Sequence, residues 1–199
     1  MDHGRQGKGR EARAGSINWL GTLLKGRPRL RQDLLFRLRS RAPHELWLVI
    51  VDASASTRRH SALSDAKGLL AQLFDDAYRQ RTRLALLTAS GRAPSWQVQG
   101  LKASKDLRHW LDGLGAAGGT PLPQALSEAA QWLEQRQRRL PAEQQRVLLI
   151  TDGRLKTLPL LQPLNCPTLL LDIERGPIRL GRARELATRL NAAYHHLDL

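Results

Sequence analysis

The chain has 199 residues, 41% of them apolar, which is enough for one α/β domain of ordinary size with a modest extension. The single cysteine, Cys166, excludes an intramolecular disulfide framework and a zinc site built from several thiolates. No apolar run approaches the roughly 18 residues that span a bilayer. The basic N-terminus is not followed by the apolar core of a signal peptide, so we expect a cytoplasmic protein that does not enter the membrane.

The net charge of +14 is unevenly distributed along the chain. Residues 1–43 hold 11 basic and 3 acidic residues, a net charge of +8, and residues 44–199 carry the remaining +6. We therefore predict a basic, partly disordered arm over residues 1–43, with residues 1–15 disordered, and one folded domain over residues 44–199. Basic arms often bind nucleic acid. Aromatic residues that would stack on bases are not interleaved here, so nucleic acid is not the partner we favour.

Strands and helices are predicted to alternate along residues 44–199. The unbroken apolar run of residues 46–51 predicts a strand that is buried on both faces, as in a parallel sheet. The predicted elements that follow are helix 61–79, strands 83–89 and 95–99, helices 105–114 and 122–139, strands 146–151 and 168–173, helix 180–190 and strand 194–197. This alternation predicts an α/β fold of the Rossmann-like type, with a doubly wound, mostly parallel sheet flanked by helices.

Oxygen donors follow the first predicted strand directly. Asp52, Ser54 and Ser56 stand at alternate positions just after the apolar run. Ligands bind at the carboxyl ends of the strands in open α/β sheets, and carboxylate and hydroxyl oxygens suit a hard divalent cation such as Mg²⁺. A helix N-cap with local hydrogen bonds would explain this motif if it stood alone. Two later segments, which contain Thr120 and Asp152, can complete a shell of oxygen ligands, so we favour a metal site.

The three segments together resemble a known metal site. They are similar to the metal-ion-dependent adhesion site (MIDAS) of von Willebrand factor A (VWA) domains. The motifs are Asp-x-Ser-x-Ser (residues 52–56), Gly-Gly-Thr-Pro-Leu (residues 118–122) and Leu-Ile-Thr-Asp-Gly (residues 149–153). The resemblance implies that Mg²⁺ or Mn²⁺ is held by Asp52 through water, by the hydroxyls of Ser54, Ser56 and Thr120, and by Asp152 indirectly or through water. It also implies one open position for an acidic side chain of a partner.

Position 55 departs from the pattern of many VWA domains, which have glycine where this chain has Ala55. Alanine supplies no ligand in either case. The site is therefore expected to survive if the backbone of Ala55 stays at negative φ, where a Cβ atom is tolerated.

Further segments resemble the D subunit of magnesium chelatase. They are residues 81–87, 118–122, 148–154 and the motif Asp-Ile-Glu-Arg-Gly-Pro-Ile-Arg-Leu-Gly (residues 172–181), which generic VWA domains lack. In that family an AAA+ subunit hydrolyses ATP, and a large subunit binds the tetrapyrrole. The complex inserts Mg²⁺ into protoporphyrin or, in relatives, Co²⁺ into a corrin precursor. The chain lacks the AAA+ domain and the acidic, proline-rich linker of the full D subunit, so it is similar to the stand-alone VWA partners of chelatases.

The resemblance implies a non-catalytic, metal-binding adaptor, not an enzyme by itself, in a magnesium- or cobalt-chelatase-type complex. Its expected partners are an AAA+ chelatase subunit and the large tetrapyrrole-binding subunit. A VWA adaptor for a MoxR-type AAA+ ATPase and a basic nucleic-acid-binding protein stay open as alternatives. Residues 113–120 have the glycine spacing of a P-loop, but Gly119 stands where the phosphate-binding lysine belongs. We therefore expect no ATPase activity from this chain.

Overall fold

The computed structural model describes residues 16–37, 44–55, 57, 62–102, 107–115, 118–155, 162–175 and 179–197. The chain divides into two compact units, Met1–Pro43 and His44–Leu199. The predicted metal ligand Ser56 and the predicted disorder of residues 1–15 lie outside the described residues. Among the described helices, none combines the length and the apolar character that crossing a membrane requires.

The described part of the first unit is a small hairpin with a helix in its connection. Strands β1 (Ser16–Ile17) and β2 (Phe36–Arg37) pair antiparallel, and the chain between them forms α1 (Trp19–Leu24) and a 3₁₀ turn over Arg31–Asp33. Asn18 caps the helix, because its side chain accepts a hydrogen bond from the backbone N–H of Gly21 at 3.1 Å. Most apolar side chains of α1 are exposed, so this unit has little core of its own.

The second unit is built on a six-stranded sheet with the order β5-β4-β3-β6-β7-β8. Its strands are β3 (Glu45–Asp52), β4 (Arg83–Ala89), β5 (Ser95–Lys102), β6 (Gln144–Thr151), β7 (Thr168–Asp172) and β8 (Ala193–His196). All neighbours are parallel except β4 and β5. The strand order reverses between β3 and β6, which makes this pair the topological switch point. The predicted doubly wound, mostly parallel fold is thus confirmed.

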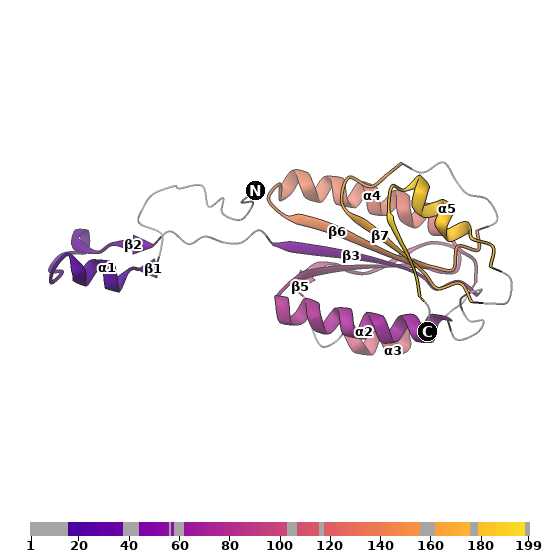
Figure 1. Cartoon of the computed structure of the whole chain (residues 1–199), viewed down its shortest axis with the longest axis horizontal. Coiled ribbons are helices and arrows are strands. Elements are labelled where there is room, and N and C mark those ends of the chain that lie inside the picture. Colours follow the sequence, from indigo (N-terminus) through magenta and orange to yellow (C-terminus); the bar gives the residue numbers. More distant parts are fainter. Residues whose placement is uncertain are drawn as a thin grey trace. The chain divides into compact units, whose positions relative to one another are not determined.

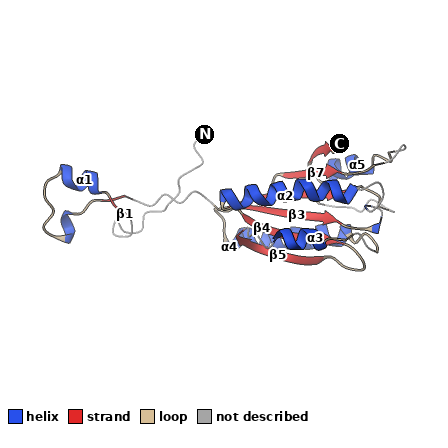
Figure 2. Cartoon of the chain, turned by 90° about the horizontal axis from the view of Figure 1, so that it is seen from below, coloured by secondary structure: helices blue, strands red, loops and turns tan. Residues whose placement is uncertain are grey.

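Helices cover both faces of this sheet (Figure 1). Helices α2 (Ala62–Gln80) and α3 (Leu107–Gly113) lie on one face, which Figure 2 shows from below, and α4 (Leu122–Arg139) and α5 (Arg182–Arg189) lie on the other. Successive side chains of a strand point to opposite faces, so Val49 and Val51 pack under α2 while Leu48 and Ile50 pack under α4 and α5. This double burial explains why the first predicted strand is apolar without interruption.

The edge strand β5 is longer than predicted, because it bends instead of ending at residue 99. Its pairing with β4 has two register irregularities, and Gly100 has a φ of +68°. A Cβ atom at Gly100 would lie 2.3 Å from a guanidinium nitrogen of Arg136 at the end of α4. Glycine therefore allows the bend and the close approach of the arginine.

Arg136 belongs to a buried ion pair at the amino-terminal end of the sheet. Its guanidinium donates two hydrogen bonds to the carboxylate of Glu143, at 2.5 and 2.9 Å, and it stacks on Trp132 at 5.2 Å. The side chain of Glu143 is 2% exposed and that of Arg136 is 15% exposed. This pair fixes the end of α4 to the beginning of β6, far along the strands from the predicted metal ligands.

Candidate metal centre

Asp52 is the last residue of β3 and is fully buried. Its Oδ1 accepts a hydrogen bond from the backbone N–H of Ser54 at 3.1 Å, and its Oδ2 accepts one from the hydroxyl of Thr151 at 2.8 Å. The pKa of Asp52 is raised to about 6, chiefly by burial and to a smaller extent by the nearby charge of Asp152, while the hydrogen bonds from Thr151 and Ser54 lower it. The carboxylate is therefore an anion at neutral pH, and a bound cation would offset the free energy that its burial costs.

Ser54 lies in the turn that leads from β3 towards α2, and it is buried. Its carbonyl accepts hydrogen bonds from the backbone N–H of Thr57 at 3.2 Å and from the hydroxyl of the same residue at 2.8 Å. Among the described residues other than glycine, positive φ occurs at Arg81 and Asn191, so Ala55 does not need the glycine that many VWA domains have here. The turn thus keeps the backbone geometry that the site was expected to require.

The loop before α4 lies beside this turn. The carbonyl of Gly118 accepts a hydrogen bond from the backbone N–H of Ala55 at 3.2 Å. Gly118 has a φ of +70°, and a Cβ atom there would lie 2.6 Å from the Cα of Gly91 in the turn after β4. Glycines on both sides therefore allow the two loops to touch. Thr120, which is half-buried, follows two residues after Gly118 and is brought to the same end of the sheet.

Asp152 follows β6 and is also buried. Its Oδ1 accepts a hydrogen bond from the backbone N–H of Arg154 at 3.0 Å, and the hydroxyl of Thr151 accepts one from the N–H of Gly153 at 3.0 Å. Within the described ranges, neither Asp152 nor Asp52 forms an ion pair with a basic side chain. Two buried carboxylates thus end adjacent strands without a cation from these parts of the chain.

Thr151 is the residue of this site that sequence reasoning missed. It donates to Asp52 and accepts from Gly153, so it links the ends of β3 and β6. The signal for it is its place as the last residue of β6. Its side chain shares a face of the sheet with Leu149 because side chains alternate along a strand, and the parallel register sets it beside Asp52.

The donor set fits a hard divalent cation. The structure brings Asp52, Ser54 and Asp152 to the carboxyl ends of β3 and β6, and the loop of Thr120 lies next to them. All the donors are carboxylate or hydroxyl oxygens, which Mg²⁺ and Mn²⁺ prefer. The described residues include no group of three or more His, Cys, Asp and Glu side chains that could hold a metal ion.

The sequence and the fold identify the same family. Residues 47–154, a little over half of the chain, match the profile of the von Willebrand factor type A domain. The chain belongs to this family. Among solved structures, the von Willebrand factor type A protein from Catenulispora acidiphila matches this VWA chain with a TM-score of 0.60 and 17% identity, over 80% of this chain and 40% of that one. This likeness shows the fold.

Two further proteins are similar to this chain, one in structure and one in sequence. The manganese-loaded TRAP protein of Plasmodium vivax has a TM-score of 0.58 and 19% identity, over 78% of this chain and 68% of that one. The magnesium-chelatase 60 kDa subunit of Rhodobacter capsulatus is 30% identical over 122 residues, which cover 61% of this chain and 21% of that subunit. This VWA protein thus resembles a magnesium-chelatase subunit, and it spans about a fifth of that relative's length.

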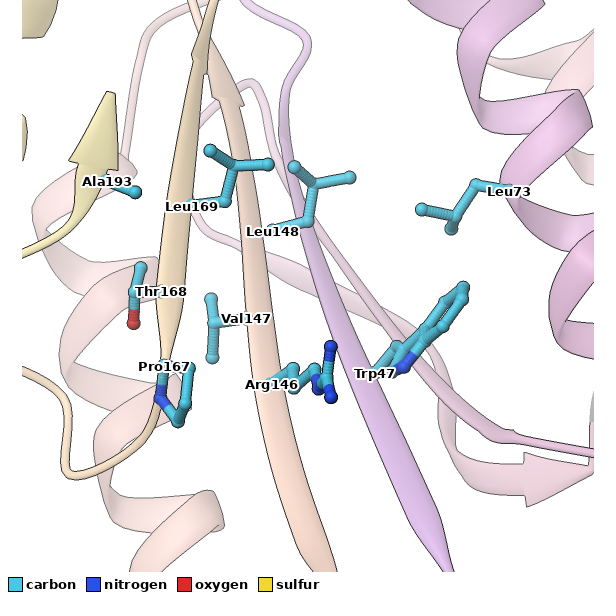
Figure 3. Close-up of a pocket in the computed structure, with 9 residues that line it drawn as sticks. All are labelled: Trp47, Leu73, Arg146, Val147, Leu148, Pro167, Thr168, Leu169 and Ala193. Carbon is cyan, nitrogen blue, oxygen red and sulfur yellow. The ribbon is translucent and has the colours of Figure 1, made fainter. Parts of the chain in front are cut away.

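A separate apolar pocket of about 450 Å³ lies on the α2 face of the sheet. Figure 3 shows Leu73 of α2 and Trp47 of β3 on one side of it and Leu148 and Leu169 on the other. Arg146 at its lining pairs with Glu45 at 2.9 Å. The pocket involves the amino-terminal halves of β3, β6 and β7, whereas Asp52 and Asp152 lie at the carboxyl ends, so it is not part of the candidate metal centre.

Proposed function

We propose that this VWA protein is a non-catalytic, metal-binding adaptor subunit of a magnesium- or cobalt-chelatase-type complex. In this role it acts in the cytoplasm and couples an AAA+ ATPase subunit to the tetrapyrrole-binding subunit. The observation that carries the proposal is the set of buried oxygen donors at the switch point of a VWA domain. The resemblance to a magnesium-chelatase subunit supports the choice of complex.

In this proposal the ligands of Mg²⁺ or Mn²⁺ are Asp52, Ser54, Ser56, Thr120 and Asp152. Thr151 holds the carboxylate of Asp52 in place by its hydrogen bond. The bound cation supplies the positive charge that the two buried carboxylates lack, together with a coordination position for a partner's acidic side chain. An acidic segment of the AAA+ subunit is the natural partner for this position.

The glycine loop before α4 supports an adaptor without its own ATPase. Gly119 occupies the place of the P-loop lysine, and even a Cβ atom there would lie 3.0 Å from the carbonyl oxygen of Gly91. The loop is therefore shaped to lie against a neighbouring turn, and the side chain that would reach a phosphate is missing. ATP hydrolysis is accordingly assigned to the separate AAA+ subunit.

Metal binding is the first test of this proposal. Titration calorimetry with Mn²⁺ should show one site in the wild type, and Asp52→Ala should bind more than about tenfold more weakly, because a buried anionic ligand is lost. Asp112→Ala is the control, since Asp112 is an exposed carboxylate on α3. Equal affinity in all three proteins would rule out the site as assigned.

Partner binding is the second test. An AAA+ chelatase subunit from the same organism should be retained on the immobilised protein in Mg²⁺ and lost in EDTA or with Thr120→Ala. Moderate salt should have only a small effect, because a metal-bridged contact is screened less than a surface charge contact. Retention in EDTA with loss at moderate salt would assign the contact to the basic residues 1–43 instead.

A further inference from the structure

Glu174 is a buried carboxylate that the candidate metal centre does not include. It follows β7, and its side chain is 1% exposed. Its Oε2 accepts hydrogen bonds from the backbone N–H groups of Leu180 at 3.0 Å and Gly181 at 3.3 Å, and its Oε1 lies 3.4 Å from Nε of Arg154. The side chain therefore joins the chain that enters α5 to the loop that follows β6.

Two further contacts tie the loop after β6 to the same region. The guanidinium of Arg182 donates a hydrogen bond to the carbonyl of Leu155. Gly153 has a φ of +65°, and a Cβ atom there would lie 2.5 Å from the backbone nitrogen of Ala183. The residues that immediately follow Asp152 are thus held by packing and by hydrogen bonds to the start of α5.

Glu174 is itself held in place from β8. Its backbone N–H donates to Oδ1 of Asp172 at 2.8 Å, and the hydroxyl of Tyr194 donates to Oδ2 of Asp172 at 2.7 Å. A ring nitrogen of His196 lies 3.0 Å from the carbonyl oxygen of Glu174. A continuous series of contacts therefore runs from β8 through Glu174 to Arg154, whose N–H holds the carboxylate of Asp152.

We propose that Glu174 is a positioning residue for the metal site. By fixing the side chain of Arg154, it holds the loop of residues 152–155 and keeps the Asp152 carboxylate in the place where it supports the ion. Groups that contact and orient a metal ligand affect metal affinity, although they do not contact the metal themselves. This inference rests on the proposed function, and it assigns a role to Glu174, one of the two acidic residues in the segment at 172–181.

A matched pair of variants tests this role. Glu174→Gln keeps the size of the side chain and an oxygen for Leu180 and Gly181, but it removes the charge that attracts Arg154. Glu143→Gln removes an equally buried charge from the pair with Arg136 at the other end of the sheet. Both variants should lose thermal stability. Only Glu174→Gln should bind Mn²⁺ roughly tenfold more weakly, and only it should speed hydrogen exchange at the amides of residues 153–155.

Arg154→Met removes the other partner of the contact, at a side chain that is 26% exposed. This variant tests the same role if Glu174→Gln does not fold. The positioning role is overturned if both variants keep wild-type Mn²⁺ affinity and wild-type exchange, or if Glu143→Gln weakens binding equally. A wild type that binds no Mn²⁺ would instead refute the proposed metal site. Hydrogen exchange would then still decide whether Glu174 holds the loop.

Discussion

In the candidate metal site, keeping the buried carboxylate of Asp52 ionised lowers the stability of the metal-free fold. Its pKa is about 6 in the folded protein, chiefly because it is buried, whereas an aspartate in an unfolded chain titrates near 4. The two states are equally protonated below about pH 4. Between about pH 4 and pH 6 the unfolded chain loses this proton first, so the contribution of Asp52 to the stability of the metal-free fold falls as the pH rises. The penalty is complete at neutral pH.

Asp52→Asn should therefore stabilise the metal-free protein at pH 7.5 while it weakens metal binding. The gain is on the order of 2 kcal/mol, which corresponds to roughly 5 °C in melting temperature for a chain of this size. It should shrink as the pH is lowered towards 4.5, because the wild-type carboxyl is then protonated. Thermal unfolding in EDTA measures this, with the exposed Asp112→Asn as control. A variant that melts no higher than the wild type at pH 7.5 would contradict the assigned ionisation.

At the same scale, the sequence was sufficient to place Asp52, Ser54 and Asp152 at strand ends, because an apolar run that stops at a polar residue marks the end of a buried strand. It did not reveal Thr151 as the partner of Asp52. That contact depends on the register between β3 and β6, and neither strand encodes this register alone. Glu174 was missed for the same reason, since its contacts come from residues distant in sequence.

Among the elements, the loop before α4 depends on a glycine at position 118. Gly118→Ala would force a side chain into a left-handed backbone and towards the Cα of Gly91. We expect a loss of about 1–2 kcal/mol in unfolding free energy from the backbone strain alone, and weaker Mn²⁺ binding because Thr120 follows two residues later. Gly115→Ala is the matched control, since a Cβ atom there meets open space. Unfolding curves and calorimetry on both variants give the comparison. Equal behaviour of the two would show that the loop does not depend on Gly118.

The helices and strands of the second unit could be predicted from apolar periodicity, with their ends shifted by a few residues. The edge strand was the exception. Its continuation to Lys102 depends on Gly100 and on the guanidinium of Arg136, which arrives from α4. The strand pattern in the sequence ends where the backbone of β5 bends at Gly100, although the pairing with β4 continues beyond this bend. Tertiary contacts therefore decide the end of this strand.

At the scale of the whole molecule, the alternation of strands and helices was enough for the fold class, because parallel strands need crossover connections. The strand order, and with it the switch point between β3 and β6, came only from the structure. The same holds for the pocket beside Trp47, which forms where residues of α2 and four strands meet (Figure 3). Periodicity identifies the face that a residue occupies, but it does not identify the neighbours on that face.

The bent edge strand also limits how another protein can attach to this sheet. A partner that adds a strand of its own needs a long, regular row of free backbone groups. On one side β5 has two register irregularities and a glycine at positive φ, and on the other β8 has only four residues. Neither border is a good template for strand addition, and both therefore resist edge-to-edge aggregation. A partner of the proposed adaptor is therefore expected to contact side chains of the loops at the carboxyl ends of the strands, not the backbone of an edge strand.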